Sequence, residues 1–157
     1  MDLKTLHKYK DEGWLMNQVH PELPLTIWNY TQQTQFEGMW DEITLSCRGL
    51  VTDDEGNIVA RPFKKFFNLE EGKHTPTKDF DVFEKMDGSL IIVFWYDGGW
   101  VVASRGSFIS EQAIGASKIF FDENPEVADE VLGKLKTALG MNGAEPAAPE
   151  SSDETEE

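Results

Sequence analysis

The sequence has 157 residues, of which 39% are hydrophobic and 27% charged, and its formal net charge at pH 7 is −15. This length and composition predict one modest globular domain. Such an acidic chain is not a nonspecific, charge-driven nucleic-acid binder, although a local basic pocket remains compatible with it. No apolar run approaches the roughly 20 residues of a membrane helix, and the N-terminus lacks a signal-peptide pattern. We therefore expect a cytoplasmic protein without membrane association.

The sequence contains one cysteine, Cys47. A single cysteine cannot form an internal disulfide, and with three scattered histidines it makes no zinc-ligand spacing. The neighbouring residues favour a strand, so we interpret Cys47 as a small buried side chain.

The N-terminal part of the chain is expected to be a helix followed by a strand. Apolar residues at near-helical spacing predict a helix over residues 2–16, and two prolines then break the chain. Residues 25–30 are predicted to form a strand. The polar run over residues 31–35 is predicted to be a loop.

Two hairpins dominate the middle of the chain. Residues 46–52 and 57–63 are predicted strands around an Asp-Asp-Glu-Gly turn. Residues 89–96 and 100–104 flank Asp-Gly-Gly, and the first arm is apolar on both faces, which predicts a central, buried strand. Between the hairpins, residues 80–85 are rich in β-formers and predict a further strand.

The C-terminal part is expected to be helical and then disordered. Ser107 or Ser110 can cap a helix that runs to about Phe121, and a last helix is predicted over residues 126–139, with Gly140 as its stop. Residues 141–157 contain six acids and no base, and we expect them to form a disordered tail. The fold class is therefore α+β, mostly antiparallel, with one domain over residues 1–140.

Three short segments carry candidate chemistry. Lys85-Met-Asp-Gly-Ser joins two predicted strands, and taken alone it reads as a surface turn. Residues 60–68 place two lysines among phenylalanines, which suits either an edge strand with a solvated basic face or a nucleotide pocket. Arg105 and Gly106 end a predicted strand before a helix, where backbone N–H groups favour phosphate.

Together these segments resemble the T-even-phage type of RNA ligase, the RNA ligase 1 family, over roughly residues 25–120. Lys-x-Asp-Gly is shared with DNA ligases and capping guanylyltransferases, so it indicates only the superfamily. The narrower signals lie on either side of it. The motifs in chain order are Ser46-Cys47-Arg48-Gly49, Ala60-Arg61-Pro62, Lys65-Phe66-Phe67-Asn68-Leu69, Lys85-x-Asp87-Gly88-Ser89-Leu90, Ser104-Arg105-Gly106-Ser107 and Ser110-Glu111-Gln112-Ala113.

The resemblance implies an ATP-dependent RNA ligase that needs Mg²⁺ and joins an RNA 5′-phosphate to a 3′-hydroxyl. Lysine first takes AMP from ATP, AMP then passes to the 5′-phosphate, and the 3′-hydroxyl finally displaces it. By resemblance Lys85 is the nucleophile that forms lysyl-AMP. The same resemblance assigns Asp87 to a metal-bound water, unless it only bonds the turn, and assigns nucleotide or phosphate binding to Arg48, Lys65, Phe67, Gly88 and Arg105.

The nucleophile must be an uncharged amine, whereas free lysine is protonated at neutral pH. Burial and nearby cations lower a lysine pKa. We therefore expect Lys85 to lie at the mouth of the core, inside a ring of positive groups that includes Lys64, Lys65 and Arg105.

The sequence departs from the family downstream. The family's ribose-binding glutamate, its Glu-Gly segment and its Lys-x-Lys segment have no counterpart, since Lys134-Leu135-Lys136 lies within a predicted helix. Loss of positioned charges slows phosphoryl transfer by orders of magnitude, so we expect weak activity or none from this chain alone.

Three explanations stay open: a split ligase completed by a second polypeptide, a truncated product, or a noncatalytic module that binds ATP or RNA ends. A capping-type guanylyltransferase is a further alternative, disfavoured by the Lys-Phe-Phe-Asn segment. For a viral protein, the compartment would be the host cytoplasm.

Overall fold

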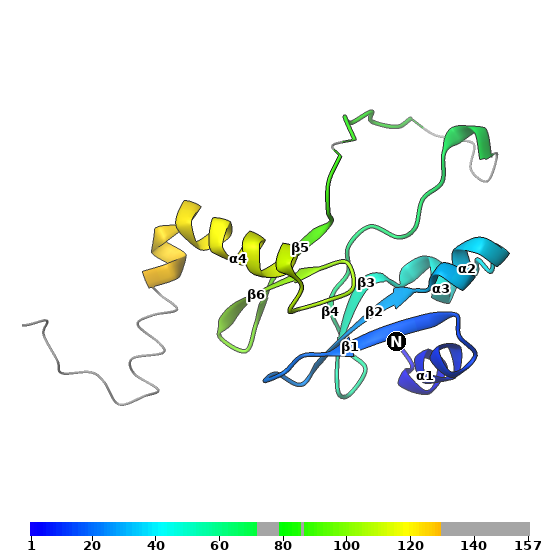
Figure 1. The fold of residues 1–157 in the computed structure, drawn as a ribbon, viewed down its shortest axis with the longest axis horizontal. Helices are drawn as coiled ribbons and strands as arrows, with labels where there is room; N and C mark the ends of the chain where they lie inside the picture. The colour runs from blue at the N-terminus through cyan, green and yellow to red at the C-terminus, as the bar shows by residue number, and fades with distance from the viewer. Residues whose placement is uncertain (72–78, 86, 130–157) are drawn as a thin grey trace, which may run out of the picture. The chain divides into compact units, whose positions relative to one another are not determined.

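The computed structural model describes residues 1–71, 79–85 and 87–129. A four-stranded sheet and a separate two-stranded sheet, with helices beside them, make an α+β fold that is antiparallel throughout (Figure 1). The predicted fold class is confirmed. The elements in chain order are α1 (Leu3–Asp11), β1 (Leu15–Val19), β2 (Leu25–Tyr30), α2 (Gln32–Glu37), α3 (Glu42–Ser46), β3 (Arg48–Asp53), β4 (Ile58–Ala60), the 3₁₀ turn η1 (Leu69–Glu71), β5 (Ile91–Tyr96), β6 (Gly99–Ser104) and α4 (Glu111–Glu123).

The chain forms two compact units, residues 1–120 and 121–157, and both sheets lie in the first. In the second unit the described residues are 121–129, of which 121–123 end α4 and 125–129 are also helical. The remainder of the predicted last helix, the domain end at residue 140 and the predicted acidic tail lie outside the described residues. Among those that are described, no helix is long and apolar enough to cross a membrane.

Helix α1 begins where expected and ends earlier. The carboxylate of Asp2 caps it by accepting hydrogen bonds from the backbone N–H groups of Lys4 and Thr5 at 3.2 Å each. Gly13, at a φ of +86°, then turns the chain, and the predicted helical end is instead β1, which pairs with β2. Pairing with a neighbouring strand outweighed the helical spacing of the local sequence.

The four-stranded sheet has the order β1-β2-β3-β4 and is buried on two sides. Leu6 of α1 packs with Trp28 and Leu50 on one face. On the other face, Ile27 and Val51 form a core with side chains of the β5–β6 hairpin. Strand β2 is therefore central, with residues of both faces withdrawn from solvent.

Two short helices replace expected loop and strand residues. The run predicted as a loop is α2, because the hydroxyl of Thr31 accepts from the N–H of Thr34 and Gly38 ends the helix at a φ of +67°. Asp41 starts α3 with a capping box. Cys47 follows as the C-cap of α3 and not within a strand. Its burial is confirmed, and that burial raises the pKa of the Cys47 thiol to about 12.

Both predicted hairpins are confirmed. In the first, Asp53 accepts from the backbone N–H groups of Glu55 and Asn57, although β4 is only three residues long. In the second, Tyr96 pairs with Gly99 around a two-residue turn at positive φ. The first arm is not buried on both faces: Ile92 and Phe94 enter the core, whereas Val93 and Trp95 are 38% and 44% exposed. A two-stranded sheet that packs by one face leaves the other in solvent.

The predicted strand over residues 80–85 is wrong. These residues have no regular structure, and Phe80, Val82 and Phe83 are exposed. A β-forming sequence needs a partner strand, and none pairs with it among the described residues. The helix after the second hairpin is confirmed as α4, and the hydroxyl of Ser110 accepts from the N–H of Ala113 at 3.2 Å in its first turn.

The two sheets meet closely at Gly49 of β3. A Cβ there would lie 2.6 Å from Cδ1 of Ile92, 3.1 Å from the carbonyl oxygen of Arg105 and 3.4 Å from Cγ of Pro62. The φ of Gly49 is +88°, a conformation that side chains disfavour. Glycine therefore lets the β5–β6 hairpin and the segment after β4 approach β3.

We predict that Gly49→Ala lowers the free energy of unfolding by about 3 kcal/mol, because backbone strain of about 1–2 kcal/mol adds to overpacking of about 1–3 kcal/mol. Chemical denaturation monitored by tryptophan fluorescence measures the change. Gly38→Ala is the matched control, since Gly38 also has a positive φ but no atom within 4 Å of the added Cβ. Equal destabilisation by the two substitutions would contradict a role for close sheet packing at Gly49.

Candidate functional site

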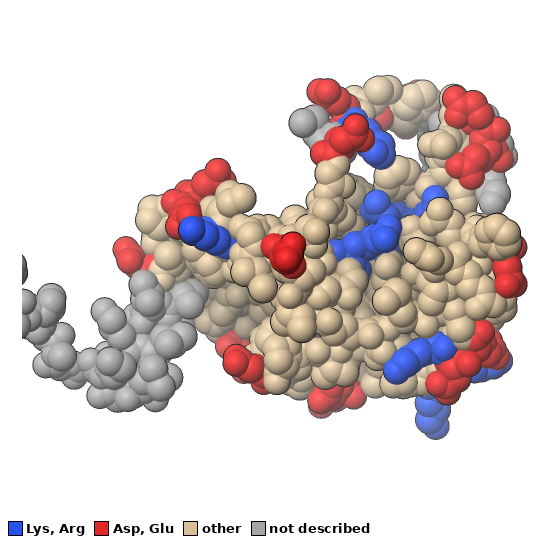
Figure 2. Space-filling view, in the orientation of Figure 1, with Lys and Arg blue, Asp and Glu red and all other residues tan. Residues whose placement is uncertain are grey.

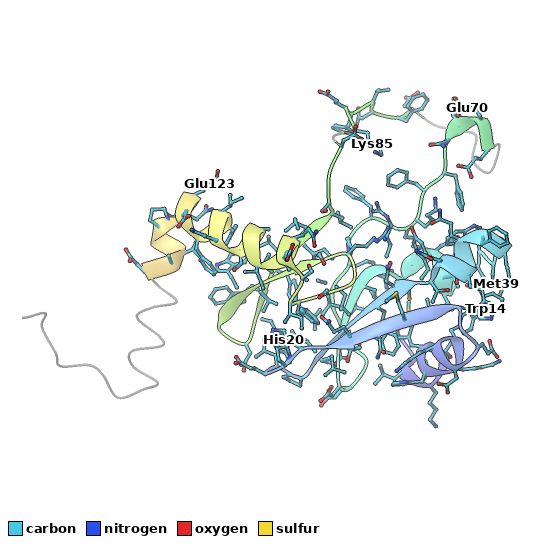
Figure 3. All side chains as sticks on the ribbon, viewed as in Figure 1. Trp14, His20, Met39, Glu70, Lys85 and Glu123 are labelled. Carbon is cyan, nitrogen blue, oxygen red and sulfur yellow. The ribbon has the colours of Figure 1, made fainter. Side chains whose placement is uncertain are left out.

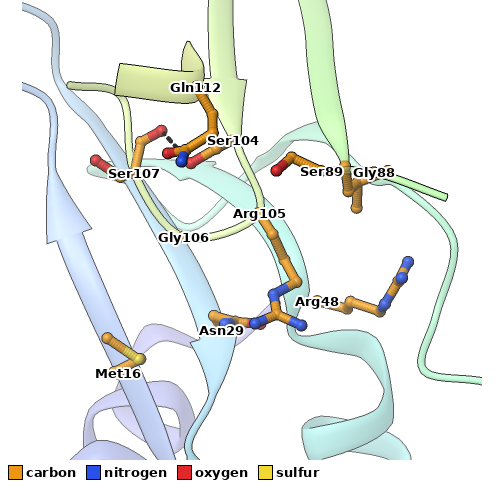
Figure 4. Close-up of a pocket in the computed structure, with 11 residues that line it drawn as sticks. Met16, Asn29, Arg48, Gly88, Ser89, Ser104, Arg105, Gly106, Ser107 and Gln112 are labelled. Carbon is orange, nitrogen blue, oxygen red and sulfur yellow. Dashed lines mark hydrogen bonds between the residues drawn. The ribbon is translucent and has the colours of Figure 1, made fainter. Parts of the chain in front are cut away.

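A hollow of about 500 Å³ lies where the two sheets meet, and we call it the arginine hollow (Figure 4). Three neighbouring strands form its floor: Met16 of β1 pairs with Asn29 of β2, which pairs with Arg48 of β3. Side chains paired across adjacent antiparallel strands point to the same face of a sheet. The walls come from residues 88–90, residues 104–107 and Gln112 of α4.

Hydrogen bonds fix the conformation of the turn after β6, residues 104–107, which lines the hollow. The N–H and the hydroxyl of Ser104 both donate to the carbonyl oxygen of Ser107, at 2.8 and 3.1 Å. Gln18 of β1 accepts from the hydroxyl of Ser107 and from the N–H of Phe108. Arg105 therefore projects from a turn that is tied to both sheets.

Two arginines give the hollow its charge. Arg48 and Arg105 both line it, and no carboxylate does. The guanidinium of Arg48 lies 5.1 Å from the ring centroid of Phe66, and that of Arg105 lies 5.7 Å from the ring of Tyr30. Figure 2 shows lysine and arginine side chains gathered in a depression near the middle of the view. Within a strongly acidic chain, this arrangement is a local concentration of positive charge of the kind that suits an anion.

The floor also holds an unpartnered polar atom. Asn29 is 6% exposed, and its Oδ1 is the one buried side-chain nitrogen or oxygen without a hydrogen-bond partner among the described residues. Such an atom costs about 1–3 kcal/mol of stability. Natural proteins usually satisfy these groups, so the unpartnered oxygen is a local cost in stability at a residue that lines the hollow.

Lys85 lines a neighbouring hollow of about 740 Å³, which we call the lysine hollow. It contains Asp87 and Phe66, and it shares Arg48 and Gly88 with the arginine hollow. Figure 3 shows Lys85 on the extended segment that leads into β5. The expectation that Lys85 lies at the mouth of the core is wrong, because its side chain is 72% exposed and pairs with Asp87 at 3.6 Å.

The structure brings only part of the expected positive ring together. Arg48 shares the lysine hollow with Lys85, and Arg105 stands in the adjoining arginine hollow. Lys64 pairs with Glu42 at 3.1 Å. Lys65 lines neither hollow, and its ammonium lies 4.3 Å from the ring of Phe67.

The aromatic pair divides between two surroundings. Phe67 packs edge-on against Trp40, at 5.5 Å between ring centroids. Phe66 instead lies under the Arg48 guanidinium and lines the lysine hollow. The role expected for Phe67 at a nucleotide stays a prediction. Phe66 lines the lysine hollow, whereas Phe67 is in the lining of neither hollow.

A metal ion would find few ligands in the chain itself. No group of three or more His, Cys, Asp or Glu side chains could hold a metal ion among the described residues. Asp87 is the exposed carboxylate that pairs with Lys85, and Asp81 and Glu84 also line the lysine hollow. This donor set fits Mg²⁺ that arrives with nucleotide phosphates and keeps most of its water, and it does not fit an ion bound by protein alone.

Sequence reasoning missed several residues of this site. Met16 and Asn29 come from neighbouring strands and belong to no motif, and Gln112 lies in the Ser110-Glu111-Gln112-Ala113 motif but was given no role. One signal was available for Asn29, which is a polar residue inside a strand of otherwise apolar and β-forming residues. Its partner across the sheet and its place beneath Arg105 depend on tertiary pairing.

Two comparisons bear on this geometry. A family model described as RNA ligase, of the T4-type ligase 1 family, matches residues 46–145, which is more than half of the chain. The chain is also 33% identical over 106 residues to "Putative bifunctional polynucleotide kinase/RNA ligase" of Autographa californica nuclear polyhedrosis virus; the match covers 59% of this chain and 15% of that protein. The matched residues include Arg48, Lys85 and Arg105, which line the two adjoining hollows, and the chain belongs to the T4-type RNA ligase 1 family.

Proposed function

We propose that this chain carries the adenylyltransferase chemistry of an ATP-dependent RNA ligase, with Lys85 as the nucleophile. One observation supports this above the others: Arg48 lines both hollows, so one guanidinium faces the space around Lys85 and the space around Arg105. A phosphate chain held by the two arginines would then lie next to the lysine amine. Membership of the RNA ligase family supports the same chemistry.

In the first step, the neutral amine of Lys85 attacks the α-phosphorus of ATP. A P–N bond forms, the bond from that phosphorus to the bridging oxygen breaks, and pyrophosphate leaves. The ammonium form of the lysine gives up two protons in all, one before the attack and one after it. Arg48 and Arg105 would stabilise the negative charge that develops on the phosphoryl oxygens. Stabilising this charge is the main way in which such enzymes accelerate phosphoryl transfer.

The second and third steps move AMP through an RNA end. An oxygen of the RNA 5′-phosphate bonds to the α-phosphorus, the P–N bond breaks, and the amine takes its protons back. A 3′-hydroxyl then bonds to the phosphorus of the 5′-phosphate, loses its proton, and releases AMP. The backbone of Gly88, which lines both hollows, leaves room for the nucleotide to approach.

Mg²⁺ would reach this site with the triphosphate. Asp87 is the carboxylate beside Lys85 that would receive it, directly or through water. The ion supplies charge neutralisation on the phosphate oxygens. The ion pair between Lys85 and Asp87 must then be exchanged, which costs little because exposed pairs contribute at most about 1 kcal/mol.

The exposure of Lys85 favours a second candidate function. The side chain of Lys85 is 72% exposed and pairs with Asp87 at 3.6 Å, so in this structure the amine lies largely in solvent. A noncatalytic module that binds ATP or an RNA end would keep the arginine hollow and need no neutral lysine. A subunit completed by a second polypeptide would react only when that partner is present.

We predict that the purified chain, incubated with α-labelled ATP and Mg²⁺, acquires label slowly, and that Lys85→Ala acquires none because no P–N bond can form. Gel autoradiography with quantitation measures this. Lys118→Ala, which changes an exposed lysine on α4, is the control and should label like the wild type. Label that persists in Lys85→Ala would exclude Lys85 as the nucleophile.

The same labelling experiment with α-labelled GTP tests the capping-type guanylyltransferase alternative. That alternative predicts stronger labelling of the protein by GTP than by ATP. The noncatalytic module would bind ATP, as measured by calorimetry, without acquiring label. Label that forms only after a second polypeptide is added would identify a split enzyme.

We predict that Asn29→Leu raises the free energy of unfolding by about 1 kcal/mol while it weakens ATP binding. The stabilisation follows because an unpartnered buried oxygen is replaced by an apolar group of similar branching. The loss of affinity follows because Asn29 lines the arginine hollow and its polar amide is replaced by an apolar side chain. Denaturation and calorimetry measure the two effects, and unchanged ATP affinity would exclude Asn29 from the nucleotide site.

A further inference from the structure

A third hollow, of about 880 Å³, lies beside Arg105 and outside the nucleotide site, and we call it the α2 hollow. Its lining is Gln32, Gln33, Gln35 and Phe36 of α2, together with Arg105. No carboxylate from the described part of the chain lines it, although acids outnumber bases about two to one in the sequence. Arg105 also lines the arginine hollow, so it stands between the two spaces.

Helix α2 is anchored so that its polar and aromatic side chains face outward. Thr34 is fully buried, and its hydroxyl donates to the carbonyl oxygen of Trp14. Residues three or four apart share a face of a helix, so Gln32, Gln35 and Phe36 share the face turned away from this anchor. Phe36 is 92% exposed, more than any other large apolar side chain among the described residues.

The composition of this hollow fits one class of partner. A protein partner would meet a contiguous apolar patch, and Phe36 is the single apolar side chain of the lining. An aromatic ring for base stacking, amides for base edges and an arginine for phosphate are the groups that bind single-stranded nucleic acid. The absence of carboxylates from the lining avoids repulsion of a phosphate backbone.

We propose that the α2 hollow binds the end of the RNA strand that is to be adenylylated, with a terminal base stacked on Phe36 and the 5′-phosphate at Arg105. This inference rests on the proposed ligase function. Since Arg105 lines both hollows, a 5′-phosphate at this guanidinium stands at the border of the nucleotide site. The ring of Tyr30 lies 5.7 Å from that guanidinium, and Tyr30 is the residue before Thr31, the N-cap of α2.

The test measures binding of an unstructured RNA oligonucleotide, 5′-phosphorylated and fluorescently labelled at its 3′ end, by anisotropy at fixed salt. We expect Phe36→Ala and Phe36→Leu to weaken binding about 10-fold, since stacking on an aromatic contributes roughly 1–3 kcal/mol per base and 1.4 kcal/mol is a factor of 10. Phe36→Trp should bind like the wild type. Val19→Ala removes another exposed apolar side chain and should change nothing.

A separate comparison tests the contact between the RNA 5′-phosphate and Arg105. Wild-type protein should bind 5′-phosphorylated RNA more tightly than 5′-hydroxyl RNA, and Arg105→Ala should abolish that preference. Full affinity in Phe36→Ala, or Phe36→Leu as tight as Phe36→Trp, would overturn the stacking role. An unchanged 5′-phosphate preference in Arg105→Ala would overturn the placement of the RNA end.

These outcomes are separable from those of the ligase proposal. Protein that forms lysyl-AMP on Lys85 but binds RNA independently of Phe36 refutes the α2 hollow alone. Protein that binds RNA through Phe36 and Arg105 but never acquires label refutes the nucleophile and leaves the RNA surface standing.

Discussion

The site depends on one close approach, that of the β5–β6 hairpin to strand β3 at Gly49. Only a residue without a side chain admits Ile92, the carbonyl of Arg105 and Pro62 around one backbone position. Arg48 immediately precedes Gly49 in the chain, and Arg105 follows β6 directly. The contact that closes the core between the sheets therefore also sets two guanidinium groups around one hollow. The packing of the two sheets and the placement of the two arginines are in this way consequences of the same constraint.

The charge distribution follows a similar logic. A net charge of −15 opposes nonspecific attraction to nucleic acid, while carboxylates are absent from the lining of both hollows that Arg105 borders. Two guanidinium groups near one another repel, and aromatic rings under each of them, Phe66 and Tyr30, offset part of that cost. The unpartnered oxygen of Asn29 beneath them is a second cost borne at the same place. Functional sites commonly carry such costs in folding stability.

Lys85 illustrates how far local sequence can be trusted. The Lys-x-Asp-Gly motif and its flanks were sufficient to indicate the RNA ligase family, which the comparison over residues 46–145 confirms. The β-forming residues up to Lys85 predicted a strand over residues 80–85, and that prediction is wrong because β-propensity expresses packing against a partner. Without a paired strand among the described residues, Phe80 and Phe83 are exposed and Lys85 lies toward solvent.

The sequence by itself determined those features that depend on a few adjacent residues. Asp97-Gly98 sets its hairpin through positive φ values, Asp53 bonds its own turn, and Ser110 accepts in the first turn of α4. Tertiary structure alone decided that residues 15–19 are a strand, that Asn29 lies beside Arg48, and that Phe66 lines the lysine hollow while Phe67 packs on Trp40. The physical reason is range: a turn or cap is closed by bonds within four residues, whereas a strand's partner and a side chain's neighbours come from distant parts of the chain and are fixed only when the core forms.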